Sequence, residues 1–275
     1  SPPCLERTKE EAVMLIAIDV GNTNMVFGIF KGEELAGTFR LKTDAIRTSD
    51  EIGLLACAYF GRFGLNTGDV EAVVIASVVP QVVYSLSSAM IKYFGREPLI
   101  IDGNVDPGLP YGVPGDERLG PDRAVADIAA IEKYGAPLIV LDFGTATTVD
   151  ALSAEGSYLG GCITAGVRIS VEALFQKAAM LPNVELTVPD TVLGCTAVGQ
   201  IQAGAVMGYI GSIEYLIRRT KAEMGYPEET IKVVATGGLA RMVADHTPLI
   251  DIVDSRLILD GLHLIYQREK ARKTV

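Results

Sequence analysis

Two segments of this chain repeat one pattern, and this repeat constrains the fold more than any other feature. Each segment is an apolar strand that ends in an aspartate, a glycine-containing turn and a second apolar strand: Ile18–Phe30 with Asp19, and Leu141–Ser153 with Asp142. An internal repeat of this kind predicts an α/β protein made of two duplicated lobes, with mixed sheets flanked by helices and a cleft between the lobes. Chance similarity of two Asp-x-Gly turns is the alternative.

The two turns have a composition suited to phosphate binding. Gly21 and Gly144 let the backbone turn tightly and approach a ligand closely. Successive backbone N–H groups in such a turn form an anion-binding concavity, and an aspartate at the strand end can hold Mg²⁺. A single loop is explained equally by a plain hairpin turn, because Asn, Gly and Asp are the usual turn residues. Two such loops favour a protein that grips nucleotide phosphates.

The sequence lacks the standard nucleotide-binding motifs. Gly115–Gly120 has the glycine spacing of a Walker loop, but Pro121 and Asp122 stand where lysine and Ser/Thr are required. No G-x-G-x-x-G leads from a strand into a helix. Thr236–Gly238 follows an apolar strand. Its glycines either let an adenine or ribose lie against the backbone or form a common strand-to-helix turn.

Asp122 has two interpretations. It stands near a predicted helix N-terminus, where the helix dipole favours a carboxylate by about 0.3–1 kcal/mol. Alternatively it is a general base, because phosphoryl transfer to an alcohol needs a carboxylate within hydrogen-bond reach of the hydroxyl. The residues alone leave this choice open.

Composition excludes several classes of protein. The formal net charge is −10, and the short tail Arg268–Lys273 is the one basic cluster, which argues against a nucleic-acid partner. The four cysteines form no CxxC pair, and His246 and His263 lie far apart, so neither a zinc site nor a Ser–His pair is supported. No apolar run reaches the roughly 18–20 residues of a membrane span. Ser1–Glu11 also lacks a signal-peptide apolar segment, so a cytoplasmic protein without membrane contact is expected.

The order of strands and helices starts again at Gly120, which predicts lobes at residues 14–118 and 119–275. Residues 1–13 are interpreted as an extension, and Gly- and Pro-rich Val105–Arg118 as a loop. Apolar runs predict strands at Met14–Asp19, Met25–Phe30, Leu35–Leu41, Ala72–Val79, Leu99–Asp102, Leu138–Leu141, Thr148–Leu152 and Ile231–Ala235. Helices are predicted at Ser49–Phe63, Gln81–Phe94, Gly120–Tyr134 and Thr196–Glu223, with a further helix after Thr236–Gly238.

Six motifs in a fixed order carry a resemblance. They are Asp19–Asn24, Gly120–Arg123, Asp142–Thr148, Gly160–Gly166, Thr196–Gly204 and Ala235–Gly238. Together they resemble the type III pantothenate kinase family, from roughly Met14 to the C-terminus, and Asp-Phe-Gly-Thr-Ala-Thr-Thr is the most discriminating piece. The resemblance implies the duplicated ribonuclease-H-like fold of actin, Hsp70 and sugar kinases. It implies transfer of the ATP γ-phosphate to pantothenate, the first step of coenzyme A synthesis, by a homodimer that needs Mg²⁺ and K⁺ or NH₄⁺.

The resemblance also implies roles for individual residues. Those expected to bind ATP are Asp19, Val20, Gly21, Asn22, Thr23, Asn24, Met25, Val26 and Thr145, with Asp19 also holding Mg²⁺. Those expected at the pantothenate site are Gly120, Pro121, Asp122 as proton acceptor, Arg123 on the substrate carboxylate, Thr196 across a dimer interface and Tyr111. Asp142 would ligate the monovalent cation.

This chain departs from the family pattern at three points. Pro121 replaces the usual alanine, which a helix start tolerates. Cys195 precedes Thr196 where the family often has Asn or a basic residue, and Gly112–Arg118, after Tyr111, differs in length. Two alternatives keep the same fold: a kinase for another small alcohol, and a regulatory accessory factor without catalysis. Retention of the three aspartates Asp19, Asp122 and Asp142 favours an enzyme.

Overall fold

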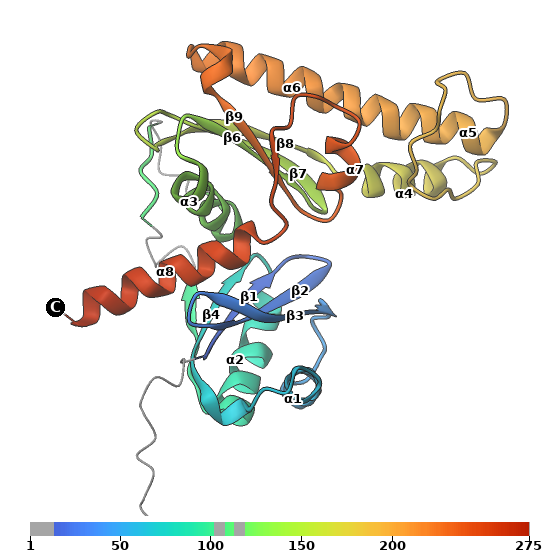
Figure 1. Ribbon diagram of the computed structural model, residues 1–275. Coiled ribbons are helices and arrows are strands. Elements are labelled where there is room, and N and C mark those ends of the chain that lie inside the picture. The colour runs from blue at the N-terminus through green and yellow to red at the C-terminus, as the bar shows by residue number, and fades with distance from the viewer. Residues whose placement is uncertain (1–13, 102–107, 113–118, 275) are drawn as a thin grey trace, which may run out of the picture. The chain divides into compact units, whose positions relative to one another are not determined.

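The computed structural model describes residues 14–101, 108–112 and 119–274. Contacts divide the chain into two compact units, Ser1–Asp106 with Leu259–Val275, and Pro107–Ile258 (Figure 1). The boundary expected after residue 118 adjoins residues 113–118, which lie outside the described residues. Residues 1–13 and most of the loop 105–118 also lie outside them. The contacts place the C-terminal segment with the first unit.

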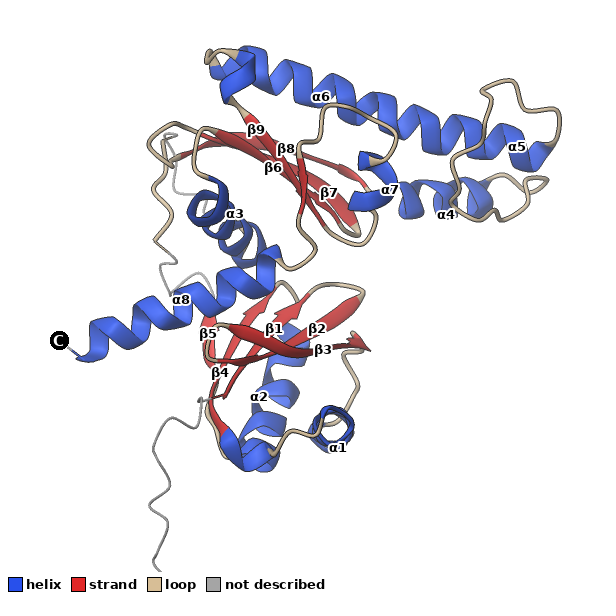
Figure 2. Ribbon diagram, viewed as in Figure 1, coloured by secondary structure: helices blue, strands red, loops and turns tan. Residues whose placement is uncertain are grey.

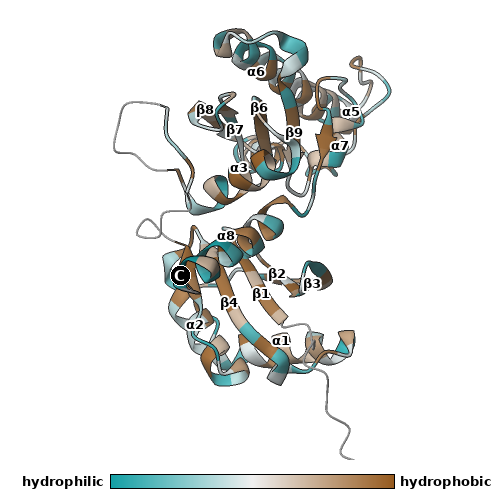
Figure 3. Cartoon of the chain, turned by 60° about the vertical axis from the view of Figure 1, so that its left-hand side comes forward, coloured by the Kyte–Doolittle hydropathy of each residue, from teal (hydrophilic) through white to brown (hydrophobic). Residues whose placement is uncertain are grey.

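The first unit is built on a five-stranded sheet in the order β3-β2-β1-β4-β5. β1 pairs with β2 antiparallel and with β4 parallel, and Asp19, near the end of β1, lies opposite Val26 and Ala76. Alternate residues of β1 face a core shared with the helices, and β1 and β4 are mostly apolar (Figure 3). The strands are β1 (Met14–Val20), β2 (Asn24–Lys31), β3 (Glu34–Lys42), β4 (Val70–Ser77) and β5 (Leu99–Ile101).

Helices cover both faces of this sheet. α1 (Ser49–Phe63) and α2 (Pro80–Phe94) pack together on one face, through buried residues such as Phe60 and Leu86 (Figure 2). α8 (Leu257–Thr274) covers the other face. There the His263 ring stacks on Phe30 with 4.6 Å between ring centroids, and the His263 Nε2 lies 3.0 Å from the Gly32 carbonyl oxygen. The predicted helix 49–63 is confirmed at both ends. A short 3₁₀ turn, Thr67–Asp69, precedes β4.

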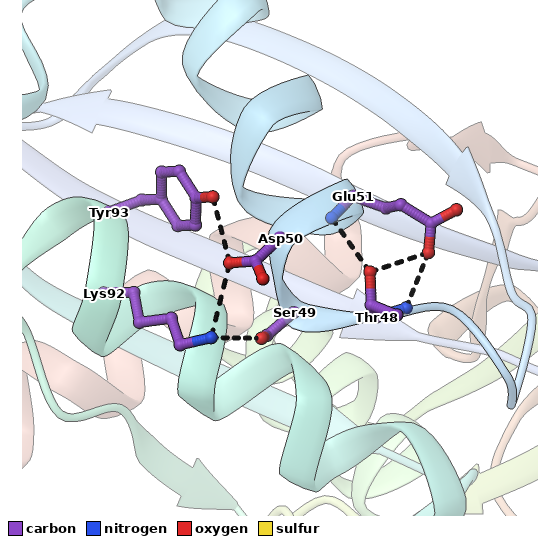
Figure 4. A network of polar contacts seen from close by, with 6 residues as sticks. All are labelled: Thr48, Ser49, Asp50, Glu51, Lys92 and Tyr93. Carbon is purple, nitrogen blue, oxygen red and sulfur yellow. Dashed lines mark hydrogen bonds and ion pairs between the residues drawn. The ribbon is translucent and has the colours of Figure 1, made fainter.

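The start of α1 is fixed by reciprocal side-chain bonds (Figure 4). The Thr48 Oγ1 accepts from the Glu51 backbone N–H at 3.2 Å, and the Glu51 carboxylate accepts from the Thr48 N–H at 2.8 Å. Asp50 accepts from the Tyr93 hydroxyl at 3.0 Å and from the Lys92 Nζ at 3.3 Å, which ties α1 to α2. The bonds between Thr48 and Glu51 satisfy two backbone N–H groups that have no partner within the helix.

We expect Thr48→Ala to lower the free energy of unfolding by about 1 kcal/mol, because a capping hydroxyl is lost. Glu51→Gln is the matched control, since glutamine also completes a capping box and most of the stability should remain. Urea denaturation of the three proteins measures both effects. Equal losses in the two variants would contradict the capping role of Thr48.

The second unit repeats the first sheet strand by strand. Its order is β10-β9-β6-β7-β8, so β6 to β10 take the positions of β1 to β5. β6 pairs with β7 antiparallel and with β9 parallel, and Asp142 lies opposite Thr148 and Thr236. The duplicated α/β architecture expected from the sequence is therefore confirmed. The strands are β6 (Leu138–Phe143), β7 (Ala146–Leu152), β8 (Tyr158–Ala165), β9 (Lys232–Thr236) and β10 (Ile252–Val253).

Helices also lie on both faces of the second sheet. α3 (Pro121–Tyr134) packs against β6 and β7 on one face. Buried apolar residues join the other face to three helices, α4 (Val167–Lys177), α6 (Gly208–Met224) and α7 (Ala240–Ala244) (Figure 1). The predicted helix 196–223 is present as α5 (Ala197–Gln202), a π-helical turn (Ala203–Met207) and α6. A short 3₁₀ turn, Glu228–Thr230, precedes β9. Among the described helices, none is both long and apolar enough to cross a bilayer.

Candidate active site

The first repeated loop is a tight turn between β1 and β2. The Gly21 N–H donates to the Asn24 carbonyl at 3.0 Å, and the Thr43 hydroxyl donates to the Gly21 carbonyl at 2.7 Å. Asp19 is half-buried at the strand end, while the side chains of Asn22 to Asn24 are exposed. The turn therefore presents polar side chains to solvent, while two hydrogen bonds hold its backbone.

The second loop, between β6 and β7, is one residue shorter. Phe143 pairs directly with Thr147, whereas in the first unit Val20 pairs with Met25. The Gly166 N–H donates to the Thr145 carbonyl at 3.1 Å, and a Cβ on Gly166 would stand 2.6 Å from that oxygen. Thr145 is exposed, and the backbone of its loop packs against Gly166, the residue before α4.

Gly237 lies directly against Asp142. Its φ of +91° is in the region that favours glycine, and an added Cβ would stand 2.5 Å from the Asp142 Oδ1 and 2.7 Å from the Phe143 backbone nitrogen. The missing side chain at Gly237 therefore leaves room for the Asp142 carboxylate beside the turn Thr236–Gly238. The adjoining helix, α7, starts at Ala240.

We expect Gly237→Ala to destabilise the protein by about 2–3 kcal/mol, through the left-handed backbone and the clash with Asp142. Gly238→Ala is the matched control, because an added Cβ there meets nothing within 4 Å. Its effect should stay within about 0.5 kcal/mol. Denaturant unfolding compares the two, and similar stabilities would show that the close approach is not required.

Two of the predicted site residues, Asp122 and Arg123, lie at the N-terminus of α3. Pro121 occupies the first helical position after Gly120, and Asp122 lies in the first turn, half-buried. The Asp122 Oδ1 accepts from the Arg123 N–H at 2.9 Å. Burial raises the pKa of Asp122, and the bond from Arg123 and its charge act in the opposite direction. Asp122 is thus a carboxylate with increased basicity at a helix start.

Arg123 is held by the neighbouring sheet. Its Nε donates to the Asp150 Oδ2 at 3.1 Å, its Nη2 donates to the Asp150 Oδ1, and Nη2 also lies 3.4 Å from the Tyr158 hydroxyl. Asp150, in the middle of β7, is 1% exposed. Burial disfavours the charged forms of both Asp150 and Arg123. For Asp150 burial is the larger effect, and its pKa is raised although the Arg123 guanidinium acts to lower it. For Arg123 burial acts to lower the pKa, but the hydrogen bonds and charge of Asp150 outweigh it and raise the pKa. The fork is thereby oriented before any ligand binds.

Tyr158 and Tyr111 extend this network. Tyr111 forms a parallel bridge with Tyr158, the two rings meet edge to face at 6.0 Å, and the Tyr111 hydroxyl accepts from the Leu119 N–H at 3.3 Å. The structure thus brings the predicted Tyr111 beside the Arg123 network. Sequence reasoning missed Tyr158 and Asp150. Asp150 follows the second turn of the repeat, and this charge in an apolar strand was the signal that could have found it.

Four carboxylates lie at this end of the second sheet: Asp122, Asp127, Asp142 and Asp150. Burial, together with the charges of Asp122 and Asp150, raises the pKa of Asp142 to about 7. A cation beside Asp142 would relieve that repulsion, so its carboxylate is a fitting donor for one. In the described part of the chain, no group of three or more His, Cys, Asp or Glu residues is arranged to hold a metal. Any ion here would take its other ligands from the substrate, backbone or water.

The remaining predicted site residues are placed separately. Thr196 is exposed and caps α5, where its hydroxyl accepts from the Gly199 N–H at 3.1 Å. Asp19 to Val26 belong to the first unit, and Asp122, Arg123, Asp142, Thr145 and Thr196 to the second.

A family model and three sequence relatives all indicate the same protein family. A model of the type III pantothenate kinase family matches residues 15–219. The type III pantothenate kinase of Myxococcus xanthus is 46% identical over 94% of this chain and 100% of that protein. Those of Exiguobacterium sibiricum and Agathobacter rectalis are 44% and 40% identical, each over 94% of this chain and 100% and 99% of their own lengths.

Solved structures extend the likeness of fold. A Campylobacter jejuni protein assigned to the Baf family of transcriptional activators has a TM-score of 0.60 at 18% identity, covering 93% of this chain and 99% of its own. A Sinorhizobium meliloti protein assigned as a 2-dehydro-3-deoxygalactonokinase has a TM-score of 0.59 at 12% identity, covering 92% and 96%. At these identities the likeness establishes the fold alone. The sequence relatives and the family model establish more: this chain belongs to the type III pantothenate kinase family.

Proposed function

We propose that this protein transfers the γ-phosphoryl group of ATP to the primary hydroxyl of pantothenate, giving 4′-phosphopantothenate in the first step of coenzyme A synthesis. Membership of the family supports the substrate. The observation that carries the mechanism is the start of α3, where the half-buried Asp122 adjoins Arg123, whose guanidinium is already oriented by Asp150.

Asp122 is proposed as the general base. A raised pKa makes its carboxylate a better proton acceptor for the pantothenate hydroxyl. Arg123 is proposed to bind the pantothenate carboxylate through the part of its fork that Asp150 does not use, since a planar guanidinium suits a carboxylate. Gly120, Pro121 and Tyr111 would form the adjoining wall. Positioning of the two reactants supplies much of the acceleration in such a transfer.

The nucleotide and its ions are assigned to the two repeated loops. Asp19 to Val26 and Thr145 are proposed to bind ATP, with Asp19 as a ligand of Mg²⁺ and Asp142 as a ligand of K⁺ or NH₄⁺. Oxygen donors of this kind suit hard cations. Such ions supply neutralisation of charge on the transferring phosphoryl group.

A homodimer is proposed on the basis of exposed apolar side chains around α4 and α5. Phe175, Met180, Leu193 and Val198 are all exposed, Met180 to 94% and Leu193 to 81%. Leu193 also lines a pocket of about 570 Å³, together with Val192 and residues of α5, the π-helical turn and the start of α6. Exposed apolar surface of this kind is typical of protein interfaces. Thr196, at the start of α5, would then lie near a partner subunit. A cytoplasmic location stays a prediction from the sequence.

An ADP-release assay tests the proposed function. The protein, ATP and Mg²⁺ are combined with pantothenate, with K⁺ or NH₄⁺ present or replaced by a bulky organic cation, and sugars and other acyl alcohols serve as competing acceptors. We expect pantothenate-dependent ADP release that the monovalent cation stimulates. Release with a sugar alone would favour another kinase activity. ATP binding without turnover on any acceptor would favour a regulatory protein.

A further inference from the structure

Asp127 is a buried carboxyl group that the proposed mechanism does not use. It lies on α3, one helical turn after Arg123, and its side chain is 0% exposed. Within the described part of the chain, neither of its carboxylate oxygens has a hydrogen-bond partner. Buried polar groups are almost always hydrogen-bonded, so this arrangement requires an explanation.

The charged and titratable groups that act electrostatically with Asp127 come from three elements. Arg123 and Asp122 belong to α3 itself, Asp150 belongs to β7, and Tyr158 belongs to β8. Arg123 is the one cation among them, and Asp150 already occupies its Nε and Nη2. Asp127 therefore lies one helical turn from Arg123 on the same side of α3, and the Arg123 guanidinium already has a carboxylate partner.

Ionised Asp127 would be very costly here, because a buried charge without hydrogen bonds loses its solvation and gains little in return. Burial raises the pKa of Asp127 well above its ordinary value, the charge of Asp150 raises it further, and Arg123 acts in the opposite direction. A buried side chain without hydrogen-bond partners therefore favours the protonated, neutral form of Asp127. Tyr158 also stays neutral, since burial and Asp150 raise its pKa.

We infer that Asp127 is a positioning residue for substrate binding: as a neutral acid it leaves Arg123 to Asp150 and the pantothenate carboxylate, and once ionised it competes with the substrate for that guanidinium. This inference rests on the proposed function for the identity of the substrate. Its physical basis is local, because a single guanidinium cannot serve three carboxylates in a buried site equally. The acid form also places no negative charge behind the arriving carboxylate.

The first experiment measures KM for pantothenate and kcat against pH, from about pH 6 to about pH 9.5, in the wild type, Asp127→Asn and Glu132→Gln. Glu132, on the exposed face of α3, is the matched control. In the wild type we expect KM to rise on the alkaline side, by up to about tenfold per pH unit once Asp127 ionises. Asp127→Asn should lose this rise because the amide has no charge to gain, and Glu132→Gln should keep it. A wild-type KM that does not change with pH, or an identical rise in Asp127→Asn, would overturn the inference.

The second experiment needs no substrate and compares the stability of the wild type and Asp127→Asn by urea unfolding at several pH values. The folded protein holds a proton on Asp127 that the unfolded chain releases above about pH 4, so the wild type should lose stability relative to the variant as pH rises from that point to the folded pKa. A constant difference in stability between pH 5 and pH 8 would show that Asp127 is ionised, which contradicts the inference. Loss of the proposed function is recognised separately, as absence of pantothenate turnover by the wild type at every pH.

Discussion

Asp122→Asn is expected to lower kcat by about 10²–10⁴-fold, the range that a general base contributes. The amide keeps the size of the side chain and its place in the first turn of α3, but it cannot accept the hydroxyl proton. Binding of ATP should be retained, because the residues proposed for ATP are elsewhere. Steady-state kinetics and nucleotide titration by calorimetry measure the two quantities, with Glu132→Gln on the same helix as the control.

The pH profile adds a second readout to this variant. A base acts in its ionised form, so kcat/KM of the wild type should fall as pH is lowered through the pKa of Asp122, which burial raises above its ordinary value. Asp122→Asn should have low activity without that acid limb. Near-normal kcat in Asp122→Asn, or an unchanged acid limb, would remove Asp122 from the role of base.

Asp150→Ala is expected to lower the free energy of unfolding by about 3–5 kcal/mol, since Arg123 loses the carboxylate that accepts its Nε and Nη2 hydrogen bonds in a buried ion pair. The remaining charge is Arg123, whose side chain is 15% exposed. Urea unfolding measures the loss. Glu155→Ala, an exposed acid in the turn after β7, is the matched control and should change stability by no more than about 0.5 kcal/mol.

Asp150→Ala should also raise KM for pantothenate, because the guanidinium loses the partner that orients it. Comparing kcat and KM separates this effect from general damage: a misplaced Arg123 chiefly weakens substrate binding, whereas a partly unfolded enzyme loses active molecules and so lowers apparent kcat. If Asp150→Ala were as stable as the wild type and bound pantothenate equally well, the ion pair would have neither role.

Much of the fold could be predicted because many of its strands and helices are specified by sequence patterns within each element. Apolar runs that end in Asp19 and Asp142 predicted β1 and β6, and the predicted helix 49–63 matches α1, which the structure shows capped by Thr48 and ended by Gly64. These signals depend on near neighbours alone. β8 gave no such signal, because Tyr158–Ala165 contains adjacent glycines that weaken the strand pattern. Its place beside β7 is decided by pairing across the sheet.

The candidate site shows the same division between local and long-range information. Asp122 and Arg123 were found from a helix start and a motif, but their environment depends on residues brought in by tertiary structure. Asp150 is 27 positions from Arg123 in the sequence, and Tyr158 is 35 positions away. Asp127 carries no signal in the sequence, and only its complete burial without hydrogen-bond partners distinguishes it. The assignment of α8 to the first unit likewise depends on packing of His263 and Leu259 against β2.

The most direct test of the account is identification of the product. The purified protein is incubated with ATP, Mg²⁺, K⁺ and pantothenate, and the mixture is analysed by mass spectrometry, with Asp122→Asn and a reaction without protein in parallel. The account predicts pantothenate that carries one additional phosphoryl group, formed in step with ADP and almost absent with Asp122→Asn. ADP formed without phosphorylated pantothenate, or equal product from the wild type and Asp122→Asn, would contradict it.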